Sequence, residues 1–491
     1  LLFKLKMLDS DYTLGKPEKT RFYTLFIYAW ISMVQCNLWF TFSSVPDYVE
    51  DYYQLSKPDN GQVNSTVDLL LNWGVIIFMV MVPITGYILL LPVKGLQWSI
   101  KLAGIFCFLG AFVRTIPTIL DSIPVFNYSI SNGFWNTIIF LHVGQILNAI
   151  GGPFVMSAIS KFSVIWYPQS QRALATAIAA TSNTFGQCFG FVIGPLLVTS
   201  GNDIPKLLYF DLVFAFIPFI CIMVYFPKSP TKLPNIAAKN ALLGTSLPSS
   251  LEDKLINDVN NVDSFSHYNG NKFTIKTHLF NWYSELKTIF SSLSSLLIVL
   301  LGGFQCGLFI GYTGVFQDML SPLGLSDDDI GLIGFVTTLL MVFGGLIMGY
   351  IADKCFTKKL KKLLMFLFIV NIILLIVLFV ILPTPFNGIY PLTTDNCPNL
   401  LIYLLVIIGI TGIFSGGSIP LFYELAAEIC APVSEGSSAT FITFILNGVA
   451  LLYIGVGNWL NTSYETLFAL IGMIGCLIAL IFVKEIYIRD L

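Results

Sequence analysis

The sequence predicts an all-α membrane protein in which twelve transmembrane helices form two six-helix halves. Three observations support this fold class: recurrent apolar runs, a one-sided distribution of lysines and an internal repeat. The chain has 491 residues, of which 55% are hydrophobic and only 11% charged, as in polytopic membrane proteins. Runs long enough to cross about 30 Å of hydrocarbon lie near residues 22–45, 67–91, 97–119, 134–160, 172–199, 205–226, 289–320, 330–351, 363–382, 400–423, 437–460 and 464–483.

The positive charges indicate which side of the membrane the termini occupy. With twelve spans both termini lie on one side, and 23 of the 26 Lys and Arg residues fall on that side. Such an excess marks the cytoplasmic face. The three Asn-x-Ser/Thr glycosylation acceptors, at Asn64, Asn127 and Asn461, fall in loops of the other side. We therefore expect both termini to be cytoplasmic.

The apolar rhythm is interrupted once, in the middle of the chain. Residues 228–285 contain prolines, many Asn and Ser and scattered charges without a sustained period, which predicts a mobile cytoplasmic linker. Its end, near residues 280–286, is expected to form a short amphipathic approach to span 7. The predicted divisions are a tail at 1–21, one half at 22–227, the linker at 228–285, the second half at 286–484 and a tail at 485–491.

The two halves repeat each other. Residues 86–88 and 349–351 both read Gly-Tyr-Ile, an offset of 263, and Gly-Gly recurs at 151 and 416, an offset of 265. A duplicated six-helix unit is typical of transporters that bind a substrate near mid-membrane and rock two halves about it.

A lysine-rich turn carries the first family resemblance. Residues 349–362 lie between spans 8 and 9 and contain five lysines and Asp353. Their pattern Gly-x-x-x-Asp-Lys-x-x-x-Lys-Lys resembles the loop signature of the major facilitator superfamily. The resemblance implies the major facilitator fold.

The sequence contains no signature of an enzyme. The only Gly-Lys pair, Gly15-Lys16, lacks the upstream glycine of a phosphate-binding loop, and no His/Cys cluster has zinc spacing. We therefore expect no enzymatic activity, no cofactor and no metal. The function must then depend on polar groups within the membrane, which are costly there unless they are paired or functional.

Four charged residues are expected to form a cytoplasmic gate. Glu424 and Glu428 share one face of a helix because they are spaced i, i+4. Asp353 and Arg172 should lie at the same depth, so the four could latch the halves shut; the alternative is that they are ordinary solvated helix ends. The first half has Leu90 where the second has Asp353, which predicts a one-sided latch.

Two charged or titratable residues are predicted in the outer third of the membrane. Arg114 in span 3 either bonds helix-end carbonyls or Asp121, or has a role in substrate binding or coupling. His142 in span 4 titrates near the pH of an acidic compartment, which makes it a candidate proton carrier. The alternative for His142 is a hydrogen bond to a neighbouring carbonyl.

Spans 1 and 5 carry polar side chains that could face a cavity. In span 5 they alternate with glycines at every fourth position, which would let another helix approach closely. The alternative is that the amides only join helices. The candidates for the cavity are Gln35, Asn37, Trp39, Asn183, Thr184 and Gln187.

A more specific resemblance is carried by residues 166–177, 190–195 and 424–438. These segments are similar to the solute carrier 49 family, the feline leukaemia virus subgroup C receptor-related transporters. In its choline-carrying branch an aromatic residue of helix 1 and glutamines of helices 5 and 11 line the site. The resemblance places Trp39 at the aromatic, and Thr184 and Asn447 at the glutamines. Tyr312 in span 7 is expected to form a fourth wall.

The sequence as a whole therefore predicts a secondary transporter that moves a small organic solute by alternating access. The resemblance to a lysosomal branch linked with proton-dependent pyridoxine uptake implies proton coupling, pyridoxine as the favoured substrate and a lysosomal location. Choline, a related amine or haem is the alternative cargo, and a non-transporting receptor or scaffold is the alternative of another class. We expect a monomer whose partners are its substrate, protons and membrane lipids, with no nucleic acid.

Overall fold

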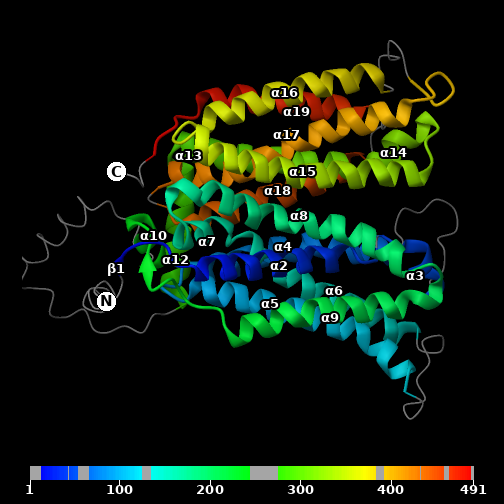
Figure 1. Ribbon diagram of the computed structural model, residues 1–491, viewed down its shortest axis with the longest axis horizontal. Helices are drawn as coiled ribbons and strands as arrows, with labels where there is room; N and C mark the ends of the chain where they lie inside the picture. Colours follow the sequence, from blue (N-terminus) through cyan, green and yellow to red (C-terminus); the bar gives the residue numbers. More distant parts are fainter. Residues whose placement is uncertain are drawn as a thin grey trace, which may run out of the picture.

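The computed structural model describes residues 13–42, 44–53, 66–123, 134–243, 275–382, 392–431, 433–457 and 464–487. Within these ranges, helices correspond to all twelve predicted spans and form two bundles (Figure 1). The N-terminal half contains α2 (Thr20–Phe40), α4 (Thr66–Leu89), α5 (Gly95–Asp121), α6 (Phe134–Met156), α7 (Ile159–Trp166), α8 (Arg172–Leu197) and α9 (Ile204–Val224). The C-terminal half contains α13 (Leu293–Gly314), α15 (Asp327–Cys355), α16 (Leu360–Ile381), α17 (Leu400–Ile429), α18 (Glu435–Gly457) and α19 (Glu465–Phe482).

Two predicted spans are each divided into two helices. The fourth span breaks after Met156, three residues beyond Pro153, and α7 continues it. Proline removes a helical hydrogen bond and weakens the turn around it. The seventh span ends at Gly314, and the short α14 (Phe316–Leu320) follows.

Ten of the described helices are long and apolar enough to cross a membrane, and α2 and α8 are not among them. These two helices bury polar side chains instead, including Gln35 and Asn183. They pack against each other. A Cβ on Gly186 of α8 would lie 2.1 Å from the backbone oxygen of Met33 in α2, so the predicted glycine stripe does allow a close helix approach. The least apolar spans are therefore shielded by helix packing.

The backbone reproduces the internal repeat at the turns that follow α4 and α15. Val93 and Lys358 have φ of 60° and 59°, and the two positions are 265 residues apart. They are the only non-glycine residues with positive φ in the described part of the chain. A β-branched residue rarely adopts this conformation; at Val93 the backbone N–H donates to the carbonyl of Leu242 at 2.8 Å.

The linker is more ordered than its composition predicts. β1 (Thr13–Leu14) and β2 (Lys232–Leu233) form a parallel pair that ties the N-terminal segment to the linker. α10 (Ile236–Leu243) packs on α7, with Ala238 buried, because its small alanines permit close contact. α12 (Ile275–Ser291) leads into α13. The described parts of the predicted linker at 228–285 thus contain regular secondary structure; residues 244–274 lie outside them.

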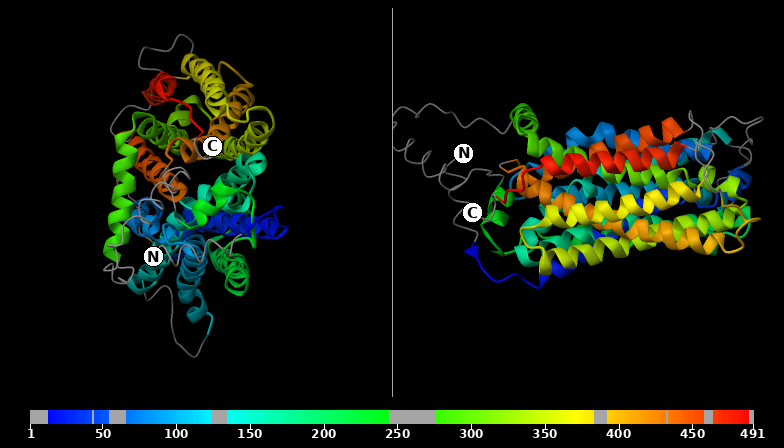
Figure 2. Two further views of the ribbon diagram at one scale, coloured as in Figure 1. Left: turned by 90° about the vertical axis from the view of Figure 1, so that its left-hand side faces the viewer. Right: turned by 90° about the horizontal axis from the view of Figure 1, so that it is seen from above.

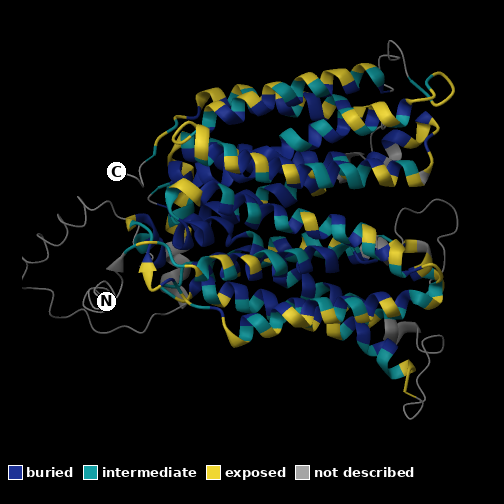
Figure 3. Cartoon of the chain, viewed as in Figure 1, coloured by how far each residue is buried: buried dark blue, intermediate teal, exposed yellow. Residues whose placement is uncertain are grey.

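The bundle has two distinguishable ends. β1 and the α15–α16 turn lie at one end, which we call the terminal end; α3 (Pro46–Tyr53) and α14 lie at the other, the distal end (Figure 1). Tyr487, the last described residue, is at the terminal end, because its hydroxyl accepts from the N–H of Leu360 at the start of α16. An end-on view shows the two halves side by side, with the green α12 running along one flank (Figure 2). Buried residues fill each half and the contact between α8 and α15 (Figure 3).

Candidate functional site

The predicted gate residues meet at the terminal end, between the two halves. Arg172 is the first residue of α8 and is 1% exposed. Its Nη1 donates to Glu428 Oε1 at 3.0 Å, and its Nε lies 3.6 Å from Glu424 Oε1. Both glutamates are buried on one face of α17. A guanidinium on one half is thus enclosed by two carboxylates of the other half.

Asp353 joins the same cluster through the backbone rather than through Arg172. It lies near the end of α15, and its two carboxylate oxygens accept from the N–H groups of Ala173 and Leu174 at 3.0 and 2.9 Å. These N–H groups belong to the first turn of α8, where the helix has unsatisfied donors and favours negative charge. The carboxylate therefore caps a helix of the opposite half.

A fifth residue in this cluster was not predicted. The Thr176 hydroxyl, one turn into α8, lies within hydrogen-bond distance of Ser163 Oγ at 2.8 Å and of Glu424 Oε2 at 3.1 Å. It is fully buried. A buried hydroxyl carries little signal in the sequence, although its position four residues after Arg172 places it on the same helix face.

The two halves touch near the terminal end and diverge toward the distal end. A Cβ on Gly349 of α15 would lie 2.6 Å from Cβ of Ala177, and one on Gly345 would lie 2.3 Å from Cγ2 of Thr181. Near the start of α15, toward the distal end, a Cβ on Gly331 or Gly334 would meet no atom within 4 Å. The described parts of α8 and α15 separate in the same direction (Figure 1). The structure is therefore closed at the terminal end.

Arg114 has a partner that the sequence analysis missed. Its Nη2 lies 2.5 Å from Oδ2 of Asp211 in α9, and both side chains are 1% exposed. Asp211 also accepts from Asn37 at 2.8 Å and from Thr41 at 2.7 Å, while Arg114 donates to the carbonyl of Leu38 at 2.8 Å. The predicted helix-end carbonyl partner is present, since Leu38 lies near the end of α2, and the carboxylate partner is Asp211 instead of Asp121. Asp211 is the only acidic residue in the predicted span 205–226, and this was the sequence signal that could have identified it as a partner.

Among the described contacts, His142 makes no bond to this pair. Its Nδ1 accepts from the indole N–H of Trp73 in α4 at 3.0 Å, and the ring is half-buried. One partner of Arg114, Gln145, lies three residues after His142 on α6, and the others lie on α2 and α9. The predicted alternative of a carbonyl partner is replaced by an indole donor, which occupies the histidine's acceptor nitrogen.

The polar residues of α2 mainly join helices. Gln35 is buried, and its Oε1 accepts from Nδ2 of Asn183 in α8 at 3.0 Å. Trp39 is half-buried, and its indole N–H donates to the carbonyl of Leu71 in α4 at 2.8 Å. Its ring packs over Gly74, where a Cβ would lie 2.4 Å from ring atoms. Trp39 is thereby held in a fixed orientation.

Thr184 and Asn447 lie at the border between the halves. Thr184 follows Thr181 by three residues on the α8 face that meets α15, and it is half-buried, like Gln187. Asn447 donates to the carbonyl of Thr443 at 2.8 Å and precedes Gly448, where α18 meets α4.

Tyr312 points elsewhere. Its hydroxyl lies 3.5 Å from Thr466 Oγ1 in α19, within the C-terminal half. The structure does not bring it to the other predicted site residues.

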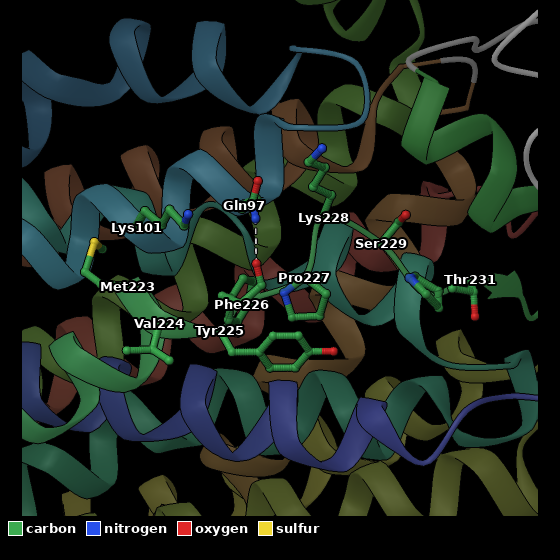
Figure 4. Close-up of a pocket in the computed structure, with 11 residues that line it drawn as sticks. Gln97, Lys101, Met223, Val224, Tyr225, Phe226, Pro227, Lys228, Ser229 and Thr231 are labelled. Atoms are coloured by element: carbon green, nitrogen blue, oxygen red, sulfur yellow. Dashed lines mark hydrogen bonds between the residues drawn. The ribbon is translucent and has the colours of Figure 1, made fainter.

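One pocket of the described structure lies within the N-terminal half and its linker. It has a volume of about 580 Å³ and lies where α5 begins and α9 ends, beside Gln97, Lys101 and residues 223–231 (Figure 4). Across the described residues, no group of three or more His, Cys, Asp or Glu side chains could hold a metal ion. The glycosylation acceptors Asn64, Asn127 and Asn461 lie outside the described residues.

Sequence comparison gives one family. The sequence profile of the Major Facilitator Superfamily matches residues 122–393. The chain is 26% identical over 465 residues to a "Solute carrier family 49 member 4 homolog" of Xenopus laevis, covering 90% of this chain and 87% of that protein. It is 22% identical to the "Choline/ethanolamine transporter FLVCR1" of Felis catus, covering 91% and 68%.

Solved structures agree on the fold. The proton:xylose symporter XylE, bound to 6-bromo-6-deoxy-D-glucose, superposes with a TM-score of 0.66 at 15% identity, covering 97% of this chain and 99% of that one. The transporter FucP in its outward conformation gives a TM-score of 0.57 at 13% identity, covering 94% and 100%.

Proposed function

The chain belongs to the Major Facilitator Superfamily, and we propose that it is a proton-coupled secondary transporter of the lysosomal membrane, with pyridoxine as its first candidate substrate. It is a multi-pass transporter of the solute carrier 49 type rather than an enzyme. The observation that supports the mechanism best is the cluster of Arg172, Asp353, Glu424 and Glu428, which we call the first latch. It joins the halves at one end only.

The first latch fits an alternating-access cycle. Its bonds connect helix ends of opposite halves, so opening the terminal end requires breaking all of them together. Closing the distal end would then expose Thr184 and Asn447 from the other side. By the lysine distribution the terminal end is cytoplasmic, so this structure corresponds to an outward-facing state. The lysosomal location follows from the family resemblance.

The proposed substrate is a small, flat or cationic solute. Trp39 supplies an aromatic face held by Leu71 and Gly74, and such a face binds cations and planar rings. Thr184 and Asn447 are shorter than the glutamines expected for choline, which favours pyridoxine. Choline or ethanolamine remains the second candidate because relatives with those names align over most of this chain.

His142 is the proposed proton carrier. It is half-buried near the distal end of α6, so a change of protonation is compatible with access from that side. Protonation of Nδ1 would remove the acceptor used by Trp73 and would thus alter the α4–α6 contact.

Uptake by purified protein in proteoliposomes tests the proposal. Pyridoxine should accumulate under an acid-outside gradient, and a protonophore should abolish the accumulation. Trp39→Ala should weaken binding about tenfold, as expected for losing roughly 1.4 kcal/mol. The exposed Trp98 provides the matched control Trp98→Ala, which should bind like the parent.

Three results would count against parts of this proposal. Binding of every ligand by Trp39→Ala as by the parent would remove the aromatic wall. Uptake of choline but not pyridoxine would select the second substrate. Complete absence of flux with either ligand, or with haem, would favour the receptor or scaffold alternative.

A further inference from the structure

The charges of the first latch have counterparts in the internal repeat. Arg172 begins α8 and Glu435 begins α18, and these positions are 263 residues apart. Glu424 near the end of α17 and Lys161 in α7 are also 263 residues apart. The offset equals that of the repeated Gly-Tyr-Ile motif. The cation Arg172 therefore corresponds to the acid Glu435, and the acid Glu424 corresponds to the cation Lys161. The two copies have opposite charges at equivalent positions.

Lys161 and Glu435 are both buried at the terminal end. They are 3% and 4% exposed, and their helices α7 and α18 pack on each other across the two halves. Lys161 Nζ donates to the carbonyl of Leu89, at the end of α4. The charges of Glu435 and Glu285 favour the ammonium form of Lys161 and oppose the cost of its burial. A buried charge of this kind needs an opposite charge nearby.

The linker contributes a second carboxylate, Glu285, at the start of α18. Glu285 of α12 accepts from Ser434 Oγ at 2.8 Å and from Ser437 Oγ, at the start of α18. Burial raises the pKa of Glu285, whereas the two hydroxyls and the charge of Lys161 lower it. Ser437 is 264 positions after Ala173, whose N–H binds Asp353 in the first latch. Glu285 thus binds two hydroxyls at the start of α18, whereas Leu90, at the position equivalent to Asp353, has no polar group to offer.

We propose that Lys161, Glu285 and Glu435 form a second latch, and that the linker helix α12 is thereby a working part of the terminal gate. This inference rests on the proposed transport cycle. α12 contacts α4 of the N-terminal half as well as α13 and α18, and it runs along the flank of both halves (Figure 2). When the terminal end opens, Lys161 must leave both carboxylates while α12 follows α13 and α18. Any factor that displaces α12 would weaken the closed state.

A buried reporter between the halves measures the closed state without a substrate. Ser160 is 0% exposed, and its Oγ lies 3.4 Å from the carbonyl of Tyr423 across the interface. Ser160→Cys, in a background where the exposed Cys355 is changed to serine, should react with a membrane-impermeant maleimide only when the terminal end opens. The protein is labelled in nanodiscs, and its folding is checked by thermal unfolding.

The second latch predicts faster labelling in three neutral variants. Lys161→Gln, Glu435→Gln and Glu285→Gln should each increase the labelling rate about 5-fold or more, at the low end of typical coupling between sites. The double variant Lys161→Gln/Glu435→Gln should add little to either single change, since both remove one interaction. Lys287→Gln, on the exposed face of the same α12, is the matched control and should label like the parent.

The variants of the two latches distinguish failure of this inference from failure of the proposed function. If Arg172→Gln accelerates labelling and the three variants do not, the second latch is wrong and the gate stands. Fully additive effects in the double variant would mean that Lys161 acts only through Leu89. If no variant of either latch changes labelling while all remain folded, the terminal gate itself is wrong. Should Lys161→Gln fail to fold, the half-buried Glu285 still decides the matter.

Discussion

Arg114 and Arg172 are chemically alike and differ in where their partners lie. Each is 1% exposed and paired with a buried carboxylate. The partners of Arg114 all belong to the N-terminal half, on α2, α6 and α9. The acidic partners of Arg172 belong to α17 of the C-terminal half. A rigid rotation of one half against the other would preserve the first pair and break the second.

The same interaction therefore has two different consequences. Breaking a buried ion pair by removing one partner costs about 3–5 kcal/mol, because a buried charge is left uncompensated. For Arg114 this energy contributes to the stability of one half in every state. For Arg172 the proposed cycle assigns this energy to the balance between two states, because opening the terminal end would break the pair.

The largest effect is expected from Asp211→Asn. Arg114 would lose its anionic partner in a buried place, so we expect destabilisation of about 3 kcal/mol or more and a lower folded yield. Thermal unfolding of purified protein measures it, and labelling of Ser160→Cys in the folded fraction should not change. Lys206→Gln is the control, since Lys206 is 68% exposed in its pair with Asp203 and such pairs contribute about 0–1 kcal/mol. Equal stability of the two variants would show that the Arg114 pair is not structural.

Arg172→Gln should have the reverse profile. It leaves Glu424 and Glu428 facing each other without their cation, so the closed state should lose its main attraction and gain a repulsion between like charges. We expect labelling of Ser160→Cys to rise at least tenfold, with a smaller loss of thermal stability than in Asp211→Asn. A large loss of stability with unchanged labelling would place Arg172 in the same class as Arg114.

A smaller difference should separate the two glutamates of the first latch. Glu428 lies 3.0 Å from Arg172, whereas Glu424 lies 3.6 Å away and is also held by Thr176. Glu428→Gln should therefore increase labelling more than Glu424→Gln, by about two- to fivefold. Thr176→Val, which removes the hydroxyl only, is the matched test of the second contact. The reverse order of the two glutamates would mean that Thr176, not Arg172, fixes the closed state.

The contrast between these regions also shows what the sequence could predict. Helices and the repeat were predictable because hydrocarbon thickness fixes the length of a span and duplication leaves a constant offset. The proximity of Arg172 to Glu424 and Glu428 followed from equal depth along their helices. The pairing of Arg114 with Asp211 was missed because depth alone does not reveal which helices are neighbours. The role of Glu285 was hidden for another reason: a carboxylate in a polar linker carries no periodic signal.

His142→Gln should have the smallest effect on either stability or gating and a selective effect on coupling. His142 belongs to neither arginine pair; its one described hydrogen bond comes from Trp73 at 3.0 Å, and the ring is half-buried. Glutamine keeps an acceptor for the indole and cannot titrate. Thermal unfolding should therefore shift by less than about 0.5 kcal/mol, and labelling of Ser160→Cys should not change. Substrate counterflow should persist, because exchange needs no net proton movement, whereas acceleration by an imposed pH gradient should disappear. Trp73→Phe, which removes the donor but leaves His142 titratable, should retain that acceleration. Gradient-driven uptake that survives in His142→Gln would mean that a carboxylate carries the coupling proton. The next residues to neutralise would then be Glu424 in the gate and Asp211 beside Arg114. Coupling would in that case depend on one of the two ion pairs compared above.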